Sequence, residues 1–257
     1  ELVYNQLVKK DGSYEMDFDH LEAEFKEGVK LFFLCSPHNP VGRAWSGEEL
    51  QRLAGLCLKY KVLVISDEIH SDLLLFGNRH IPFASLGKEV ADLTLTCMAP
   101  SKTFNLAGLY TSVMIATNPH LKKRYEKVLD AVHVGGDNIL GQVALEAAYT
   151  RGDEWLDQLL EYLEENYRSF CTMLNATVPE LIISPLEATY LTWLDFSFLK
   201  LDDKALNDFI IHRAGLGLND GPMFGPGGSG HQRLNLATPR KILMEGAERL
   251  AGAVRGA

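Results

Sequence analysis

The chain has 257 residues, of which 46% are apolar and 23% are charged. This composition is typical of a globular protein with one large or two smaller domains, and it argues against a disordered chain. The net charge of −9 argues against nucleic acid or an anionic membrane as a partner, because both attract clustered Lys and Arg side chains. A small anionic ligand is still compatible with a locally positive pocket.

Cysteine usage and apolar stretches suggest where the protein works. The four cysteines are widely spaced, three of them lie in apolar runs, and no two form a C-x-x-C pair. We therefore expect reduced thiols, a cytoplasmic location and no metal site. No apolar stretch is long enough to predict a membrane span. The chain begins with Glu1 rather than Met, which suggests a fragment, a processed product or an incomplete sequence.

The first half of the chain alternates apolar strands with helices. A helix is expected over residues 19–28, with Asp19 as its N-cap, and a second over 47–60, where Ser46 and Glu49 form a capping box. A strand, a helix and a strand in succession indicate a right-handed crossover in a parallel sheet, and hence an α/β fold. The strands are predicted over residues 31–35, 62–65, 93–98 and 112–116.

The second half has a different pattern. From residue 119 onward the apolar residues recur three or four apart, which predicts long amphipathic helices. We place a boundary near residue 150, with a large domain over 1–150 and a smaller α+β domain over 151–257. The smaller domain is expected to contain strands over 190–194 and 233–236 and helices over 203–214 and 239–254.

Lys102 is the only charged side chain between Asp92 and Lys122. A lone lysine is most often a solvated surface group. Here two apolar strands flank it, so the lysine is expected to be largely buried and to need a partner, a neutral state or a covalent bond. Burial lowers the pKa of an amine and leaves a nucleophile that can form a Schiff base with an aldehyde.

Two polar residues follow predicted strand ends, where open α/β sheets place ligand-binding groups. Asp67 is either a loop or cap carboxylate or a partner for a pyridine nitrogen, whose proton an anionic carboxylate retains. Asn39 lies between Pro37 and Pro40, which restrict the backbone and hold the amide in a set direction. Asn39 is then either a turn residue or a hydrogen-bond donor to a ligand. His70 is expected to be structural or to act behind the ligand-binding groups.

Arg233 follows a glycine-rich stretch over 225–230 that fits G-x-G-x-x-G. We reject a dinucleotide-binding fingerprint, because a strand and not a helix follows the glycines. The stretch is interpreted as a flexible loop. Arg233 is either a surface or ion-pair residue or a bidentate anchor for a substrate carboxylate.

Four segments together resemble fold type I enzymes of the aminotransferase class I/II group, which depend on pyridoxal 5′-phosphate (PLP). The resemblance implies an incomplete PLP-binding large domain, with Lys102 as the catalytic lysine and with Asn39, Asp67, His70, Ser101 and Lys102 at the cofactor. It further implies that Asn39 and Arg233 bind the carboxylate of a small amino-acid substrate. The segments are Ser36-Pro37-His38-Asn39-Pro40-Val41-Gly42-Arg43, Ser66-Asp67-Glu68-Ile69-His70, Ala99-Pro100-Ser101-Lys102-Thr103-Phe104-Asn105-Leu106-Ala107-Gly108-Leu109 and His231-Gln232-Arg233-Leu234-Asn235-Leu236-Ala237-Thr238-Pro239-Arg240.

Within this group the sequences of these segments are most similar to those of the MalY/PatB-type C–S β-lyases. Tyr110 stands where many aminotransferases have a phosphate-binding Arg, and His70 stands where many have a Tyr. The resemblance implies a homodimer, and an upstream segment with a phosphate-binding loop and a ring-stacking tyrosine. It implies cleavage of an S-substituted cysteine such as cystathionine to a thiol, pyruvate and ammonia. An aminotransferase and a non-catalytic or incomplete protein remain the alternatives.

Overall fold

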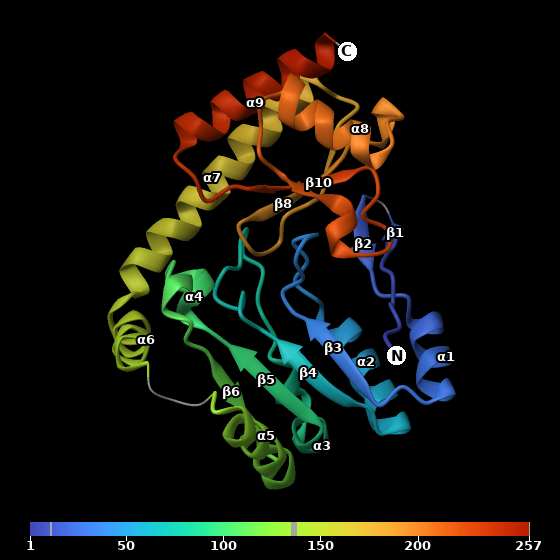
Figure 1. Cartoon of the computed structure of the whole chain (residues 1–257), viewed down its shortest axis with the longest axis vertical. Coiled ribbons are helices and arrows are strands. Elements are labelled where there is room, and N and C mark those ends of the chain that lie inside the picture. Colours follow the sequence, from blue (N-terminus) through green and yellow to red (C-terminus); the bar gives the residue numbers. More distant parts are fainter. Residues whose placement is uncertain (11, 135–137, 257) are drawn as a thin grey trace.

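The computed structural model describes residues 1–10, 12–134 and 138–256. Within these ranges the strands form two four-stranded sheets and a two-stranded hairpin. Figure 1 shows the two larger sheets one above the other. The strands of the lower sheet are blue to green, and those of the upper sheet are brown to orange.

The first sheet has the order β3-β4-β5-β6. Its first three strands are parallel, and the fourth pairs antiparallel to β5. The predicted α/β class and a mostly parallel sheet are therefore confirmed. The strands are β3 (Leu31–Cys35), β4 (Leu63–Asp67), β5 (Thr94–Met98) and β6 (Val113–Ile115).

Helices pack on one face of this sheet. The buried side chains of Phe25, Leu34, Leu50 and Val64 belong to one apolar core between the helices and the sheet. The contributing helices are α1 (Phe18–Glu27), α2 (Gly47–Tyr60) and α3 (Lys88–Asp92), while α5 (Pro119–Val132) follows β6.

The helix ends test the capping predictions. The capping box of Ser46 and Glu49 is present and begins α2, as predicted. The predicted cap at Asp19 is wrong, because α1 begins at Phe18 and its N-cap is Asp17, two residues earlier. Asp17 accepts a hydrogen bond from the backbone N–H of His20 at 3.0 Å, so Asp19 lies within the first turn. Aspartate is a preferred N-cap residue, so both positions fit by residue type. Only the backbone distinguishes them, since Asp17 is extended and Asp19 is helical.

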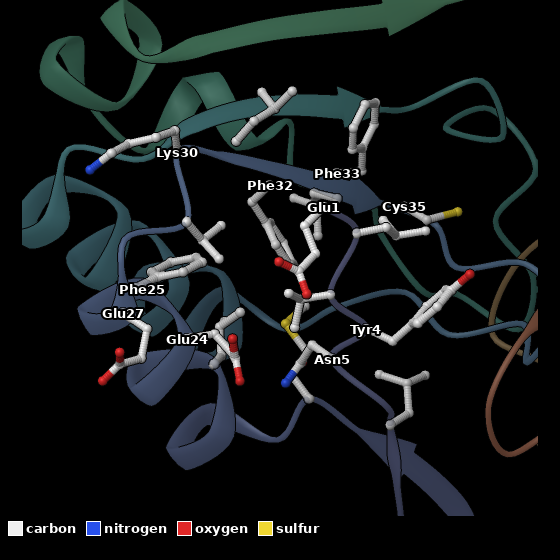
Figure 2. A pocket seen from close by; sticks show the side chains of 18 of the residues that line it. Glu1, Tyr4, Asn5, Glu24, Phe25, Glu27, Lys30, Phe32, Phe33 and Cys35 are labelled. Carbon is white, nitrogen blue, oxygen red and sulfur yellow. The ribbon is translucent and has the colours of Figure 1, made fainter.

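The edge of the first sheet at β3 is more open. Phe33 has 66% of its surface exposed, and in the register it pairs with Ile65 on the neighbouring strand. Figure 2 shows a groove of about 920 Å³ where Tyr4 lies across from Phe33 and Cys35. None of the predicted site residues lines this groove, so it is separate from the site described below.

The second sheet is antiparallel and has the order β7-β8-β10-β9. A second apolar core, which includes the fully buried Leu163 and Phe170, joins it to the helices α7, α8 and α9. Its strands are β7 (Ile182–Ile183), β8 (Leu191–Asp195), β9 (Asn219–Asp220) and β10 (His231–Asn235), and its helices are α7 (Asp153–Thr177), α8 (Asp203–Asp208) with a π-helical continuation over Phe209–Arg213, and α9 (Arg240–Arg255).

The boundary predicted near residue 150 falls at the end of α6 (Ile139–Arg151), and the division into two domains stays a prediction. The hairpin of β1 (Val8–Lys10) and β2 (Ser13–Glu15) contacts the second sheet. Lys9 forms an ion pair of 2.6 Å with Asp195 there. None of the helices in the described ranges is long and apolar enough to cross a membrane.

Candidate active site

The loop after β3 presents Asn39. Two backbone hydrogen bonds close the turn. The N–H of Gly42 donates to the carbonyl of His38 at 2.8 Å, and the N–H of His38 donates to the carbonyl of Arg43 at 2.7 Å. Gly42 has a φ of 74°, and a Cβ there would lie 2.5 Å from a methyl carbon of Leu186. Glycine is thus required both by the backbone conformation and by the close approach of the segment that leads to β8. The turn fixes Asn39 between the two sheets.

Asp67 is the last residue of β4, at the carboxyl end of the parallel strands. Its register neighbours are Cys35 and Cys97, so two thiols flank it on the same face of the sheet. The carboxylate accepts a hydrogen bond from the backbone N–H of Ile69 at 3.3 Å. Burial raises the pKa of Asp67, and the positive charge of Lys102 counteracts this rise. Lys102 and Asp67 are therefore electrostatic neighbours in one site.

Lys102 lies in the short helix α4 (Pro100–Thr103), which follows β5. The helix is tied to the loop after β4, because Thr103 donates a hydrogen bond of 2.8 Å to Asp72. The hydroxyl of Tyr149 donates to the same carboxylate oxygen at 3.3 Å. Lys102 and its neighbour Ser101 are both half-buried, so the expectation that Lys102 is largely buried is wrong.

His70 is a buried residue with 3% of its surface exposed. Burial, with the charges of Lys102 and Arg233, lowers the pKa of His70 to about 4. Its ring meets the edge of Tyr190 at a centroid distance of 5.7 Å, and its Nδ1 has no hydrogen-bond partner within the described residues. The ring is thus neutral near pH 7 and has an unused polar atom at the site.

Arg233 lies in β10, in the second sheet. One terminal nitrogen donates to Oδ1 of Asn39 at 2.7 Å, and the other donates to Oδ1 of Asn219 at 2.8 Å. The ring of Phe224 lies 4.6 Å from the guanidinium carbon. The predicted substrate-binding pair, Asn39 and Arg233, is therefore in direct contact although 194 residues separate the two along the chain.

Glu68 follows Asp67 but belongs to a different environment. It has 1% of its surface exposed and accepts hydrogen bonds from Ser66 at 2.7 Å and from the backbone of Phe83 at 3.0 Å. His80 lies 2.7 Å from its second oxygen. Glu68 is satisfied within the protein, so it supports the loop after β4 and is not offered to a ligand.

The predicted site residues therefore meet where the loops after β3, β4 and β5 face the second sheet (Figure 1). His70 lies between the two halves of the site, since the charges of both Lys102 and Arg233 lower its pKa. Sequence reasoning missed Tyr190, Asn219 and Phe224, which contact His70 or Arg233. Tyr190 was predicted only as a strand residue, and Asn219 carried no motif.

The site combines groups suited to an anionic ligand that has a carbonyl. A lysine amine in the same site as a half-buried carboxylate can form and hold a covalent adduct with an aldehyde. Arg233 offers a planar guanidinium to a carboxylate, and the side-chain amides of Asn39 and Asn219 contact that guanidinium. The described residues contain no group of three or more His, Cys, Asp or Glu side chains that could hold a metal ion.

The chain is similar in sequence and in fold to known proteins. Cystathionine beta-lyase PatB of Bacillus subtilis strain 168 is 42% identical over 254 residues, which cover 98% of this chain and 66% of PatB. The crystal structure of cystalysin from Treponema denticola, which contains a pyridoxal 5′-phosphate cofactor, has a TM-score of 0.96 and 40% identity, and the match covers 99% of this chain and 65% of cystalysin. The PLP-bound C–S lyase from Staphylococcus hominis has a TM-score of 0.89 and 37% identity, with 98% and 64% covered.

The chain thus spans about two thirds of the length of these relatives. The match to the family described as Aminotransferase class I and II extends over residues 3–250, which is nearly the whole chain. The matched range includes all four segments of this chain on which the resemblance was based. The chain belongs to the aminotransferase class I and II family.

Proposed function

We propose that the protein is a PLP-dependent C–S β-lyase that converts an S-substituted cysteine, such as cystathionine, to a thiol, pyruvate and ammonia. The observation that carries the proposal is the meeting of Lys102 and Asp67 with the Asn39–Arg233 pair across two sheets. A cofactor site and a carboxylate site are then next to each other. The relatives whose names refer to cystathionine β-lyase or C–S lyase support this assignment.

The residues at the site fit PLP. Lys102 would bind its aldehyde carbon, and Asp67 would hold the proton on its pyridine nitrogen. Asn39 would bind its phenolic oxygen, and Ser101 and His70 would contact it from the lysine helix and the loop after β4. The unpartnered Nδ1 of His70 is consistent with a ligand at this place. When bound, PLP supplies an electron sink for the bonds at the amino acid's Cα.

Each residue then has a separate task in the elimination. Arg233 binds the substrate carboxylate through its fork, and Asn39 orients both the carboxylate and Arg233. The free amine of Lys102 removes the proton from Cα. Burial raises the pKa of Asp67, and the hydrogen bond from the backbone of Ile69 opposes this rise, as would a protonated pyridine nitrogen beside the carboxylate. His70 stays neutral, so it adds no charge that would compete for the substrate carboxylate.

The test is a product assay on the full protein supplied with PLP and cystathionine. We expect pyruvate and a thiol in equal amounts when no keto acid is added as a co-substrate. Lys102→Ala should lower the rate by about 10³-fold or more, in the range of a lost general base. Lys123→Ala, which removes an exposed lysine on α5, is the matched control and should leave the rate unchanged. Wild-type protein that binds PLP but releases no pyruvate would refute the proposal.

An aminotransferase is the second candidate, because the family itself includes aminotransferases. It would use the same residues but need a keto acid as acceptor, and it would release an amino acid and no pyruvate from cystathionine. Tyr110 stands where many aminotransferases have a phosphate-binding Arg, and this departure favours the lyase. Failure of the purified chain to take up PLP would instead support the third alternative, an incomplete or non-catalytic protein.

Two expectations from the sequence go with this proposal. A homodimer and a cytoplasmic location both stay predictions. Sedimentation equilibrium of the full protein tests the first, and fractionation of cells that express it tests the second.

A further inference from the structure

The guanidinium of Arg233 is held at both ends by neutral oxygens. Asn39 accepts from one terminal nitrogen at 2.7 Å and comes from the first sheet's loop, whereas Asn219 accepts from the other at 2.8 Å and comes from β9. Phe224 lies against the face of the group, 4.6 Å from its central carbon. The direction of the fork is therefore set before any ligand arrives.

The charge of Arg233, in contrast, is left uncompensated. Within the described parts of the chain no Asp or Glu forms an ion pair with it, although Arg43 pairs with both Glu49 and Glu187. Its Nε is buried and has no partner among those residues. A guanidinium has five N–H donors, and the two amide oxygens use only two of them. Both charge and donors remain for a ligand.

Asn219 is well placed to keep the site in this state. It pairs with Arg233 in the register of β9 and β10, so the backbone fixes its distance from the guanidinium. The next residue, Asp220, does carry a carboxylate, but that oxygen accepts from the side chain of Gln232 at 3.0 Å. Alternation along the strand thus puts an amide beside Arg233 and directs the neighbouring acid elsewhere.

We propose that Asn219 is a positioning residue that orients Arg233 and, because its side chain is neutral, makes the site select substrates with a free α-carboxylate. The inference rests on the proposed function, in which Arg233 binds that carboxylate. A carboxylate at position 219 would occupy the same volume but pair with the cation, and the substrate would then have to compete with it.

The informative variant is Asn219→Asp, tested on the full protein with PLP. Two substrates are compared, an S-substituted cysteine and its α-carboxamide, which differ in one charge. We expect kcat/KM for the acid to fall by about tenfold or more, mainly through KM, and kcat/KM for the carboxamide to change by less than about twofold. Asn219→Ala keeps the site neutral and should raise KM for both substrates by a similar factor.

Asn175→Asp is the matched control, because it adds the same charge at an exposed position of α7 and should leave both substrates unaffected. A second readout needs no turnover. Propionate, which has a carboxylate but no amine, should raise the melting temperature of wild-type protein and of Asn175→Asp, and should have a much smaller effect on Asn219→Asp.

The inference is overturned if Asn219→Asp changes both substrates equally, or if propionate stabilises it as much as wild type. If Asn219→Asp does not fold, equal protection of wild type and Asn219→Ala by propionate overturns the positioning role. Failure of the proposed function is distinct from these results. In that case wild-type protein releases no pyruvate, while the propionate measurement still tests the role of Asn219 at Arg233.

Discussion

Gly221 and Gly228 touch through their backbones next to the segment that carries Asn219. A Cβ on Gly221 would lie 1.9 Å from the carbonyl oxygen of Gly228 and 2.6 Å from that of His231. Ordinary contacts of this kind exceed about 3 Å, so the two backbones would have to separate by more than an ångström. Neither strand end can move freely, because β9 and β10 are paired there.

Gly221→Ala is therefore expected to destabilise the protein strongly. Overpacking of a rigid contact costs about 1–3 kcal/mol, and a clash between two backbones belongs at the upper end, about 3 kcal/mol. Gly217→Ala is the matched control, because a Cβ at Gly217 meets no atom within 4 Å and its φ is not positive. That change should be neutral or stabilise by about 0.5 kcal/mol, through a less flexible unfolded chain.

The assay is urea unfolding followed by tryptophan fluorescence, which reports on the second sheet through the buried Trp193. We expect the midpoint for Gly221→Ala to fall well below that of wild type and the midpoint for Gly217→Ala to stay at or above it. Since Gly221→Ala also moves Asn219 relative to Arg233, KM for the amino acid should rise in any folded fraction. Equal midpoints for the two variants would refute the packing argument.

The remaining predictions concern charge, pH and the core. Arg233→Lys should lower kcat/KM for the amino acid by about 100-fold, because an ammonium cannot replace a bidentate fork, and steady-state kinetics checks this. The pKa of His70 is about 4 when folded and about 6.5 when unfolded, so the unfolded chain binds more protons between these pH values and stability falls as the pH drops through that window. His70→Asn should remove up to about 3 kcal/mol of this pH dependence, measured by urea unfolding at pH 7 and pH 4.5. Phe170→Ala, at a side chain with 0% exposure, should cost about 3–5 kcal/mol, whereas Ile242→Ala, at 58% exposure, should change the unfolding free energy by less than about 0.5 kcal/mol in the same assay.

The regular elements could be predicted because their signals are local. The apolar run at 31–35 and the capping box before α2 each specify structure within a few residues, and both predictions are confirmed. The cap of α1 was misplaced by two residues, since Asp17 and Asp19 are equally good cap residues by type. The hairpin of β1 and β2 was missed, because its three-residue strands show no clear alternation and depend on contacts with the second sheet.

The candidate site could be predicted only where the residue types formed a motif. Asn39, Asp67, Lys102 and Arg233 belong to such segments, and the structure places them together. Asn219 could not be found this way. Its role depends on the pairing of β9 with β10, and β9 is only two residues long.

The glycine-rich stretch at 225–230 shows how composition can be read in two ways. Its glycines suggested a flexible loop, yet the structure joins it by backbone hydrogen bonds from Gly225 to Pro222 and from Gly228 to Gly225. The amide of Gly230 also donates to Asp203 at 2.9 Å. The glycines are needed here for close backbone approach as much as for conformational freedom. A segment of this kind can hold β9 against β10 and so fix the partner of Arg233.

The charge distribution explains how an acidic protein can bind an anionic substrate. The chain has a net charge of −9, but the site combines the cations Lys102 and Arg233 with the carboxylate of Asp67. If Lys102 is bound to the cofactor and Asp67 holds a protonated ring nitrogen, Arg233 is the cation left for the substrate. The neutrality of its two amide partners then matters for affinity, because a charge added at Asn219 would lie 2.8 Å from the guanidinium, whereas solvent screens the distant surface acids.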